Sequence, residues 1–318
     1  MHRPTLVFAL CALAGSACGE SSPTAQQSAL PAVERVVLVS IDGLRADALP
    51  AMPTLGALAQ RGAWTDEMGT VLPSITVPGH LSMLSGTDVT QLGVRSNTID
   101  TTQAIALAMA GFSTVFNWVH GAGGTSQAVA GANLIPPALR ASTHEFLGVD
   151  TMIATDVDGA VIMDRALAIE DGAAPPTLLF IHLPDADLAG HASGWIVPDA
   201  GPTDVLGSDY LAAVRRTDDA LARLWADLGP KVERGEVALI VTADHGGGHG
   251  EGCTAGVPAY REHCTDTPGD RTIPFVLVAK GITPQRLASP TRVTQVAPTI
   301  AGMLRVWTPR QADRPIGL

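Results

Sequence analysis

The chain has 318 residues, of which 46% are hydrophobic and 16% are charged, and its mean hydropathy is +0.23. This composition suits one large globular domain or two small ones and excludes a disordered protein. The formal net charge of -11 repels phosphate backbones, so we expect no nucleic acid polymer as a partner. A small anionic ligand would need local positive charge, and metal ions are one source of it.

The N-terminal segment has the features of an export signal. The apolar run Leu6–Leu13 is too short to span a bilayer but is typical of a signal-peptide core. Small residues then lead to Cys18, where cleavage would produce a bacterial lipoprotein with a lipid anchor; cleavage after Ala17 and simple secretion is the alternative. We therefore predict a signal peptide over residues 1–17, a flexible tether over residues 18–34, and a periplasmic, secreted or membrane-anchored protein.

The rest of the chain alternates between predicted strands and helices. Apolar runs bounded by turn residues predict strands at Val36–Ile41, Thr114–Val119, Leu178–Leu183, Val237–Val241 and Ile273–Ala279. Helical patterns lie between them, at Met52–Gln60, Gln103–Ala110, Tyr210–Leu228 and Gln295–Leu304. This alternation predicts a single α/β domain over residues 35–318, with a mostly parallel central sheet and helices on both faces. Gly123–Ala160 and Gly246–Thr272 are expected to be excursions that shape a pocket.

Two acidic motifs directly follow predicted buried strands. Asp42 comes after Val36–Ile41, and the pair Asp244 and His245 comes shortly after Val237–Val241. The carboxyl ends of parallel strands meet at one edge of a sheet, which is where open α/β sheets bind their ligands. Adjacent Asp and His there suggest a metal. Local alternatives remain, because Asp42 could cap a helix and Asp244 could form a turn with the following glycines.

A hydroxyl group precedes a predicted helix in the segment Thr76-Val77-Pro78-Gly79-His80. Pro78 is suited to the first turn of a helix, so Thr76 lies at or just before the N-terminus. The hydroxyl could be an N-cap. It could instead be a nucleophile whose alkoxide is stabilised by a metal and by the positive end of the helix.

A second Asp and His pair follows the predicted strand Leu178–Leu183. Asp187 and His191 are four residues apart, so both side chains can reach one ion if the segment is helical or tightly turned. A lone pair at this spacing is weak evidence for a metal site. Its place after a buried strand strengthens the prediction.

Two cysteines remain beyond the leader, Cys253 and Cys264. In an exported chain, two cysteines that flank a loop containing Gly and Pro predict a disulfide. A zinc site built on them is the weaker alternative.

Other polar residues receive local interpretations. His80, His144 and His182 are expected to be packing or surface histidines. Asn117 and His120 lie at the end of the predicted strand Thr114–Val119, so they could line a substrate pocket.

The order of the motifs carries a family resemblance. Along the chain they are strand-Asp42, Thr76 before Pro-Gly-His, Asp187-x-x-Gly-His191, and strand-Asp244-His245. This series resembles the alkaline phosphatase superfamily, particularly its type I phosphodiesterase/nucleotide pyrophosphatase branch. The resemblance covers essentially the whole mature chain and implies an alkaline-phosphatase-like fold.

The resemblance implies two divalent metal ions, for which the mixed Asp and His ligands favour zinc. It assigns one ion to Asp187, His191 and a late histidine, and the other to Asp42, Thr76, Asp244 and His245. In short members of the family the late histidine stands shortly before the last strand, as His263 does here. His263 is therefore preferred over His249.

The resemblance also implies a small anionic phosphoester as substrate. Thr76 would attack phosphorus to form a phosphothreonine, and Asn97 would donate a hydrogen bond to a phosphoryl oxygen. Family members often have a histidine at the position of Leu92, which this chain lacks. Asn97 keeps its spacing from Thr76, although a turn role remains the alternative.

Three other activities fit these residues less well. Sulfatases need a Cys or Ser in a C/S-x-P-x-R motif, and the segment that begins at Thr76 lacks both that residue and the arginine. Phosphomonoesterases need additional positive groups, and no Lys or Arg pair is apparent, so phosphodiesters or phosphonates are favoured over phosphomonoesters. Phosphodiesters are the preferred substrates, and phosphomonoesters or phosphonates are the alternatives. A catalytically degenerate surface lipoprotein that binds a ligand is the non-enzymatic alternative.

Overall fold

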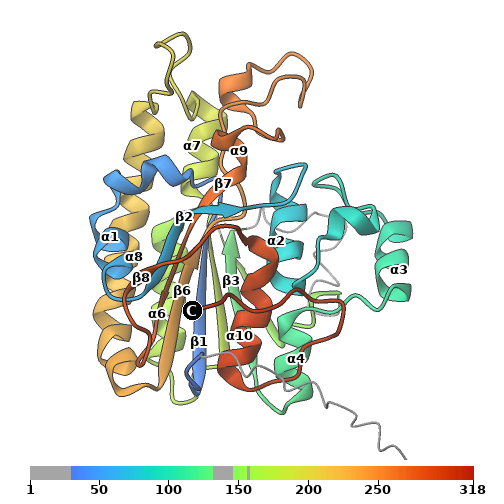
Figure 1. Cartoon of the computed structure of the whole chain (residues 1–318), viewed down its shortest axis with the longest axis vertical. Helices are drawn as coiled ribbons and strands as arrows, with labels where there is room; N and C mark the ends of the chain where they lie inside the picture. Colours follow the sequence, from blue (N-terminus) through green and yellow to red (C-terminus); the bar gives the residue numbers. More distant parts are fainter. Residues whose placement is uncertain (1–29, 132–145, 156–157) are drawn as a thin grey trace, which may run out of the picture.

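The computed structural model describes residues 30–131, 146–155 and 158–318, and these contain one nine-stranded sheet (Figure 1). The strand order is β4-β3-β5-β1-β6-β7-β2-β8, and β9 pairs with β2. The strands are β1 (Arg35–Ile41), β2 (Ala63–Gly69), β3 (Ser126–Gly131), β4 (Thr151–Thr155), β5 (Leu178–Leu183), β6 (Val237–Thr242), β7 (Thr272–Val278), β8 (Gln285–Arg286) and β9 (Thr291–Arg292). The predicted α/β fold with a mostly parallel sheet in a single domain is confirmed.

The parallel half of the sheet carries the apolar strands that the sequence indicates. The five strands of this half are parallel to one another, in the order β4, β3, β5, β1 and β6. All residues of β5 and β6 are buried, because helices cover both faces of the sheet. Beyond β6 the direction changes: β7 is antiparallel to β6, and β2 is antiparallel to β7.

Helices form a layer on each face of the sheet, as Figure 1 shows. One layer contains α1 (Pro53–Ala59), α6 (Gly159–Glu170) and α8 (Ser208–Arg234), and the other contains α2 (Thr76–Ser85), α4 (Val115–Gly121) and α10 (Val296–Leu304). The remaining α-helices among the described residues are α3 (Thr101–Met109), α7 (Asp185–Ser193) and α9 (Pro268–Arg271). None of the described helices is long and apolar enough to cross a membrane.

One predicted strand is a helix. Residues 114–119 open α4, because the Thr114 hydroxyl accepts from the amide of Phe116 and the Asn117 side chain accepts from the amide of Thr114. These two capping bonds satisfy amides at the start of a helix and outweigh the local strand preference of the apolar residues.

The strands β3 and β4 occupy the segment that was expected to be an excursion, residues 123–160. They extend the sheet beyond β5 with short runs that are rich in small residues. The prediction also missed β2, in which buried and partly exposed residues are mixed and which lies between β7 and β8 on the other side of the sheet. Segments of this kind lack the continuous apolar run that marks a central strand.

The N-terminal predictions lie largely outside the described residues. This holds for the signal peptide at 1–17, for Cys18 and for most of the tether. From Leu30 the chain packs on the domain: Leu30 is buried, and its carbonyl accepts from the Arg305 guanidinium at 3.0 Å. The last residues of the expected tether therefore belong to the packed domain.

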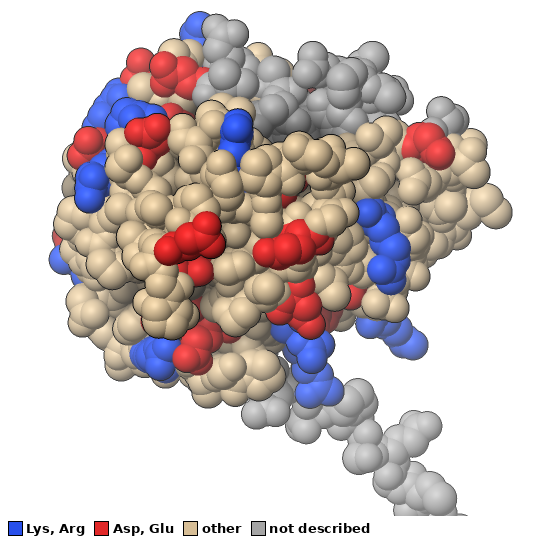
Figure 2. Space-filling model, turned by 90° about the horizontal axis from the view of Figure 1, so that it is seen from above, with Lys and Arg blue, Asp and Glu red and all other residues tan. Residues whose placement is uncertain are grey.

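The edge of the sheet where the parallel strands end faces the viewer in Figure 2. On its described part, acidic and basic side chains are interspersed, without one large patch of a single sign. Most of the candidate metal ligands lie beneath this surface, because Asp42, Asp187, Asp244, His245 and His263 are buried.

Candidate metal centre

Three aspartates meet at the carboxyl ends of neighbouring strands. Strand β1 lies between β5 and β6, so Asp42 after β1, Asp187 in α7 after β5, and Asp244 after β6 leave the sheet side by side. The amide of Asp187 donates to the carbonyl of Asp42 at 3.1 Å. Gly43 has a φ of +68°, and a Cβ there would lie 2.9 Å from Cα of Asp187. Glycine therefore permits the close approach of the first two segments.

Two buried groups of side chains among the described residues could each hold a metal ion. One group is Asp187, His245 and His263, and the other is Asp42, Asp244 and His245. The ligand atoms within each group lie within 4.8 Å of one another. Because His245 belongs to both groups, the two sites are neighbours.

Buried carboxylate oxygens without partners mark where positive charge is needed. Asp42 Oδ1, Asp187 Oδ1 and Asp244 Oδ2 are buried and have no hydrogen-bond partner. The other oxygen of Asp42 accepts from His182 Nε2 at 3.0 Å, and the other oxygen of Asp244 accepts from the Gly43 amide at 3.3 Å. Burying bare carboxylate oxygens is costly, so these residues fit a bound cation.

The histidines are oriented in the way that metal ligands require. The Nδ1 atom of each donates to a backbone carbonyl, so each Nε2 lone pair points to the cluster: His191 to Arg261 O at 2.9 Å, His245 to Gly246 O at 2.7 Å, and His263 to Ser74 O at 2.8 Å. The Nε2 atoms of His191 and His263 are 3.2 Å apart. Two lone pairs repel each other at this distance unless a cation or a proton lies between them.

The close packing of carboxylates and imidazoles shifts the pKa values of several residues in the cluster. Burial lowers the pKa of His245, but the Asp244 and Asp42 carboxylates outweigh it and raise the pKa to about 10. Burial and the charge of Asp42 raise the pKa of Asp187 well above its usual range. Burial and the charge of His245 hold the pKa of His263 well below its usual range. A bound cation would therefore replace protons at His245 and Asp187.

Thr76 lies at the same centre. It is the first residue of α2, and its Oγ1 is 3.1 Å from His245 Nε2. The N-cap position is Ile75, so the Thr76 hydroxyl does not cap the helix. A Cβ at Gly79 would lie 2.7 Å from the Asp244 carbonyl oxygen, which shows how closely the first turn of α2 packs on the metal cluster.

Asn97 is held near Thr76 by a hydrogen bond to the backbone of the next residue, Val77. Its Oδ1 accepts from the amide of Val77 at 2.9 Å, which leaves the Asn97 NH₂ group as a donor. A pocket of about 460 Å³ is lined by Asn97 together with His191 and His263. Arg95 and Glu262 line the same pocket and bring one charge of each sign.

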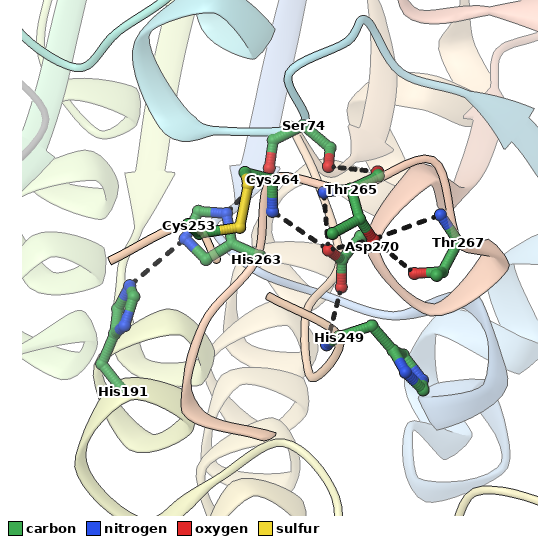
Figure 3. Close-up of a disulfide and its surroundings, with 9 residues drawn as sticks. All are labelled: Ser74, His191, His249, Cys253, His263, Cys264, Thr265, Thr267 and Asp270. Carbon is green, nitrogen blue, oxygen red and sulfur yellow. Dashed lines mark hydrogen bonds between the residues drawn. A yellow bond between two sulfur atoms is a disulfide. The ribbon is translucent and has the colours of Figure 1, made fainter. Parts of the chain in front are cut away.

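The loop closed by the disulfide ends next to His263 and places its side chain close to His191, as Figure 3 shows. Cys253 and Cys264 form the predicted disulfide, with Cα atoms 6.0 Å apart, so these cysteines are not zinc ligands. Asp270 is fully buried and accepts hydrogen bonds from the amides of His249, Cys264 and Thr265 at 2.9 to 3.1 Å. One carboxylate thus ties together both ends of the loop.

The structure brings His263 to the cluster and leaves His249 outside it. The His249 ring contacts Asp204, at 2.8 Å from Nε2. All seven residues assigned to the metals lie at this edge of the sheet: Asp42, Thr76, Asp187, His191, Asp244, His245 and His263.

Asn117 and His120 do not line the pocket. Asn117 caps α4, and His120 contacts Asp150, whose other oxygen accepts from the amide of Ser126 at the beginning of β3. They therefore lie toward the amino ends of the parallel strands, opposite the metal centre. Their expected place depended on a strand at 114–119, which is a helix. His144 lies outside the described residues.

Two histidines that were interpreted as packing or surface residues contact the centre. His182 is fully buried and donates to Asp42. His80 Nδ1 is 2.9 Å from the Thr76 carbonyl oxygen and 3.2 Å from Asp244 Oδ2. One signal for His182 was available in the sequence, because a histidine within a buried apolar strand needs a polar partner. The partner itself became visible only in the fold.

The fold is that of a protein in the alkaline phosphatase superfamily, and the buried Asp and His cluster could hold metal ions. The family model "Type I phosphodiesterase / nucleotide pyrophosphatase" matches residues 36–105 and 102–285, so the chain belongs to this family of metal-dependent phosphoester hydrolases. A comparison with curated proteins found no match.

Solved structures show the same fold at low sequence identity. An alkaline phosphatase superfamily protein from Vibrio parahaemolyticus is 18% identical, with a TM-score of 0.62, over 90% of this chain and 70% of that one. Murine ectonucleotide pyrophosphatase/phosphodiesterase 5, an inactive variant in complex with AMP, is 14% identical, with a TM-score of 0.61, over 90% and 97%. A sulfatase-like protein from Bacteroides thetaiotaomicron is 14% identical, with a TM-score of 0.64, over 90% and 73%.

Proposed function

We propose that this protein hydrolyses phosphodiesters through a covalent intermediate on Thr76, with two zinc ions bound at the Asp and His cluster. One observation supports this most strongly: Thr76 Oγ1 lies 3.1 Å from His245 Nε2, in a cluster whose bare oxygens and lone pairs fit cations. Asp187, His191 and His263 would hold one ion. Asp42, Thr76, Asp244 and His245 would hold the other.

The residues account for each step of the reaction. Thr76 loses its hydroxyl proton and its Oγ attacks phosphorus while the bond from phosphorus to the departing alkoxide breaks. The alkoxide takes up a proton and leaves as the alcohol, and Thr76 is left as a phosphothreonine. Water then attacks phosphorus, the bond to Thr76 Oγ breaks, and the threonine is restored. The Asn97 NH₂ group and the N-terminus of α2 stabilise the phosphoryl oxygens. Bound zinc supplies Lewis-acid stabilisation of the negative charge.

Diesters suit the charges of the pocket better than monoesters. A monoester dianion carries one more negative charge than a diester, and the Glu262 carboxylate in the pocket wall opposes it. Arg95 is exposed on the same pocket and offers a single compensating charge. Phosphomonoesters and phosphonates are the alternative substrates. A purely ligand-binding role is disfavoured because every expected side chain is present at the centre.

The test compares Thr76→Ala with Thr283→Ala, which removes an exposed hydroxyl near β8. Hydrolysis of bis-p-nitrophenyl phosphate should fall at least about 10³-fold in Thr76→Ala and stay unchanged in the control. Thermal melting and zinc content should show that both variants are folded and loaded. Full activity of folded Thr76→Ala would disprove the nucleophile, and a zinc-free, inert unmodified protein would support the binding role.

The N-terminal motif supports export from a bacterial cell and a lipid anchor on Cys18 as a further proposal. Mass spectrometry of the mature N-terminus in a bacterial host tests it. A diacylglyceryl-modified Cys18 would establish the anchor, cleavage after Ala17 that leaves Cys18 without lipid would indicate simple secretion, and an unprocessed N-terminus would contradict both.

A further inference from the structure

His182 occupies an unusual place for a polar residue. It is the fifth residue of β5, whose residues are all buried, and it pairs in register with Ser40 of β1. Asp42 follows β1 two residues after Ser40. The strand pairing therefore brings the imidazole directly behind the carboxylate.

The contacts of the two ring nitrogens of His182 indicate which nitrogen carries the hydrogen atom. Its Nε2 lies 3.0 Å from Asp42 Oδ2, and its Nδ1 is buried without a partner. A carboxylate oxygen accepts hydrogen bonds, so the proton on the Asp42 side is carried by Nε2. The His182 bond thereby occupies Oδ2 of Asp42 and leaves Oδ1 facing the cluster, where its neighbour is His245 Nε2 at 3.3 Å.

The His182 ring is held in place by a second histidine. The two rings of His80 and His182 pack edge to face, with centroids 5.1 Å apart. His80 Nε2 is 2.9 Å from the hydroxyl of Ser40, and His80 Nδ1 is 2.9 Å from the carbonyl of Thr76. Rotation of His182 away from Asp42 is therefore opposed by packing on a neighbour that is itself hydrogen-bonded.

We propose that His182 is a positioning residue for Asp42: its Nε2–H holds Oδ2 of that carboxylate and thereby presents Oδ1 to the cation site shared with Asp244 and His245. The inference rests on the proposed two-metal function. If His182 only filled space, an apolar side chain of similar size would serve equally well. If it positions Asp42, the hydrogen-bond donor is what matters.

The decisive comparison is between His182→Leu, which removes the donor, and His182→Gln, whose amide can donate from a similar reach. Loss of a hydrogen bond to a metal ligand costs 10–100-fold in metal affinity, so we expect one of the two zinc ions to bind about 10- to 100-fold more weakly in His182→Leu. His182→Gln should bind both ions within about 3-fold of the unmodified protein. His249→Leu is the control, because its ring lies outside the cluster.

Zinc affinity of the full chain is measured by competition with a chromophoric chelator, and the absorption spectrum of the cobalt-substituted protein reports ligand geometry. Equal zinc affinities for His182→Leu and the unmodified protein would overturn the proposal, as would equal losses in the Leu and Gln variants. Failure of the unmodified protein to bind two zinc ions would instead contradict the proposed function.

A mutant cycle separates an effect of His182 through Asp42 from an effect on the fold in general. The background is Asp42→Asn, in which the ligand is already weakened. If His182 acts through Asp42, the change from His182 to Gln or Leu should alter zinc affinity far less in this background than in the unmodified chain. Equal effects in both backgrounds would show that His182 acts on the fold in general and would overturn the proposal.

Discussion

At the scale of single residues, backbone carbonyls select the tautomers of the metal-centre histidines. The carbonyls of Ser74, Gly246 and Arg261 each take the Nδ1 proton of one ring. None of these acceptors lies in a sequence motif, because any residue type supplies a carbonyl. The ligand side chains are thus encoded by residue type, and their orientation is determined by the course of neighbouring loops.

Gly43 is expected to be sensitive to substitution for two separable reasons. Gly43→Ala combines the strain of a positive φ with a Cβ placed 2.9 Å from Cα of Asp187. Gly93→Ala has the same kind of strain, at a φ of +89°, but meets no atom within 4 Å. We expect Gly43→Ala to lower the free energy of unfolding by about 1 to 3 kcal/mol more than Gly93→Ala. Urea unfolding measures the difference; equal losses would mean that the contact with Asp187 is not limiting.

Glu262 is expected to set the preference for diesters over monoesters. Removing its charge in Glu262→Gln should raise the ratio of kcat/KM for p-nitrophenyl phosphate to that for bis-p-nitrophenyl phosphate by about 5-fold, because one solvated charge contact is worth about 1 kcal/mol. Glu251→Gln is the control, an exposed carboxylate on the same loop that does not line the pocket. An unchanged ratio in Glu262→Gln, or the same rise in both variants, would refute this role.

At the scale of elements, the segment between β6 and β7 closes the metal centre. It leaves the sheet at Asp244, passes through the disulfide loop, and returns with His263 before β7 begins at Thr272. The Asp270 carboxylate and the disulfide both restrain it (Figure 3). The shape of this segment is therefore maintained by polar contacts rather than by an apolar face.

Removal of the Asp270 carboxylate should loosen this segment. Asp270→Ala leaves the partly buried amides of His249, Cys264 and Thr265 without their acceptor, so the free energy of unfolding should fall by about 2 to 4 kcal/mol. Asp266→Ala removes an exposed carboxylate from the same segment and is the matched control. Denaturant unfolding of the zinc-free proteins provides the measurement. Similar losses in the two variants would show that Asp270 does not organise the loop.

At the scale of the whole molecule, the crowded carboxylates couple stability to pH when zinc is absent. The pKa of His245 is about 10 in the folded protein and about 6.5 in an unfolded chain. Its proton therefore stabilises the fold fully below pH 6.5, and this contribution is lost as the pH rises toward 10. The raised pKa of Asp187 likewise makes the fold less stable as the pH rises, because its proton is bound more tightly in the folded protein than in the unfolded chain.

We therefore expect the chelator-treated protein to lose stability between pH 6.5 and pH 10. The lowered pKa of His263 opposes this trend only near pH 6.5, where an unfolded histidine still releases its proton; at higher pH this residue is neutral in both states. Urea midpoints measured across the window test the expectation, and the zinc-loaded protein should show a smaller fall, since bound cations replace the protons. A flat or rising midpoint in the zinc-free protein would contradict it.

The sequence predicts most of the central fold because buried strands are strongly patterned. The runs at 178–183 and 237–241 coincide with β5 and β6, and the helical pattern at 210–228 lies within α8. The strands β2, β3 and β4, toward the two sides of the sheet, were missed, since short or polar strands depend on pairing with a neighbour. The helix at 115–121 was missed because two capping side chains outweigh its apolar pattern.

The sequence by itself determined which side chains are available for chemistry. The types of Asp42, Thr76, Asp187, His191 and Asp244, and their order along the chain, carry the family resemblance that implies a phosphoester hydrolase. Their positions after buried strands predict that they meet, because parallel strands end at a common edge.

Only the tertiary structure decided how these side chains act together. It placed His263 rather than His249 in the cluster, brought His182 behind Asp42, and put Glu262 in the wall of the pocket. Each of these contacts joins segments far apart in the chain. Local sequence patterns carry no information about such contacts, since they arise from strand order and from the hydrogen bonds that hold the long loop before β7.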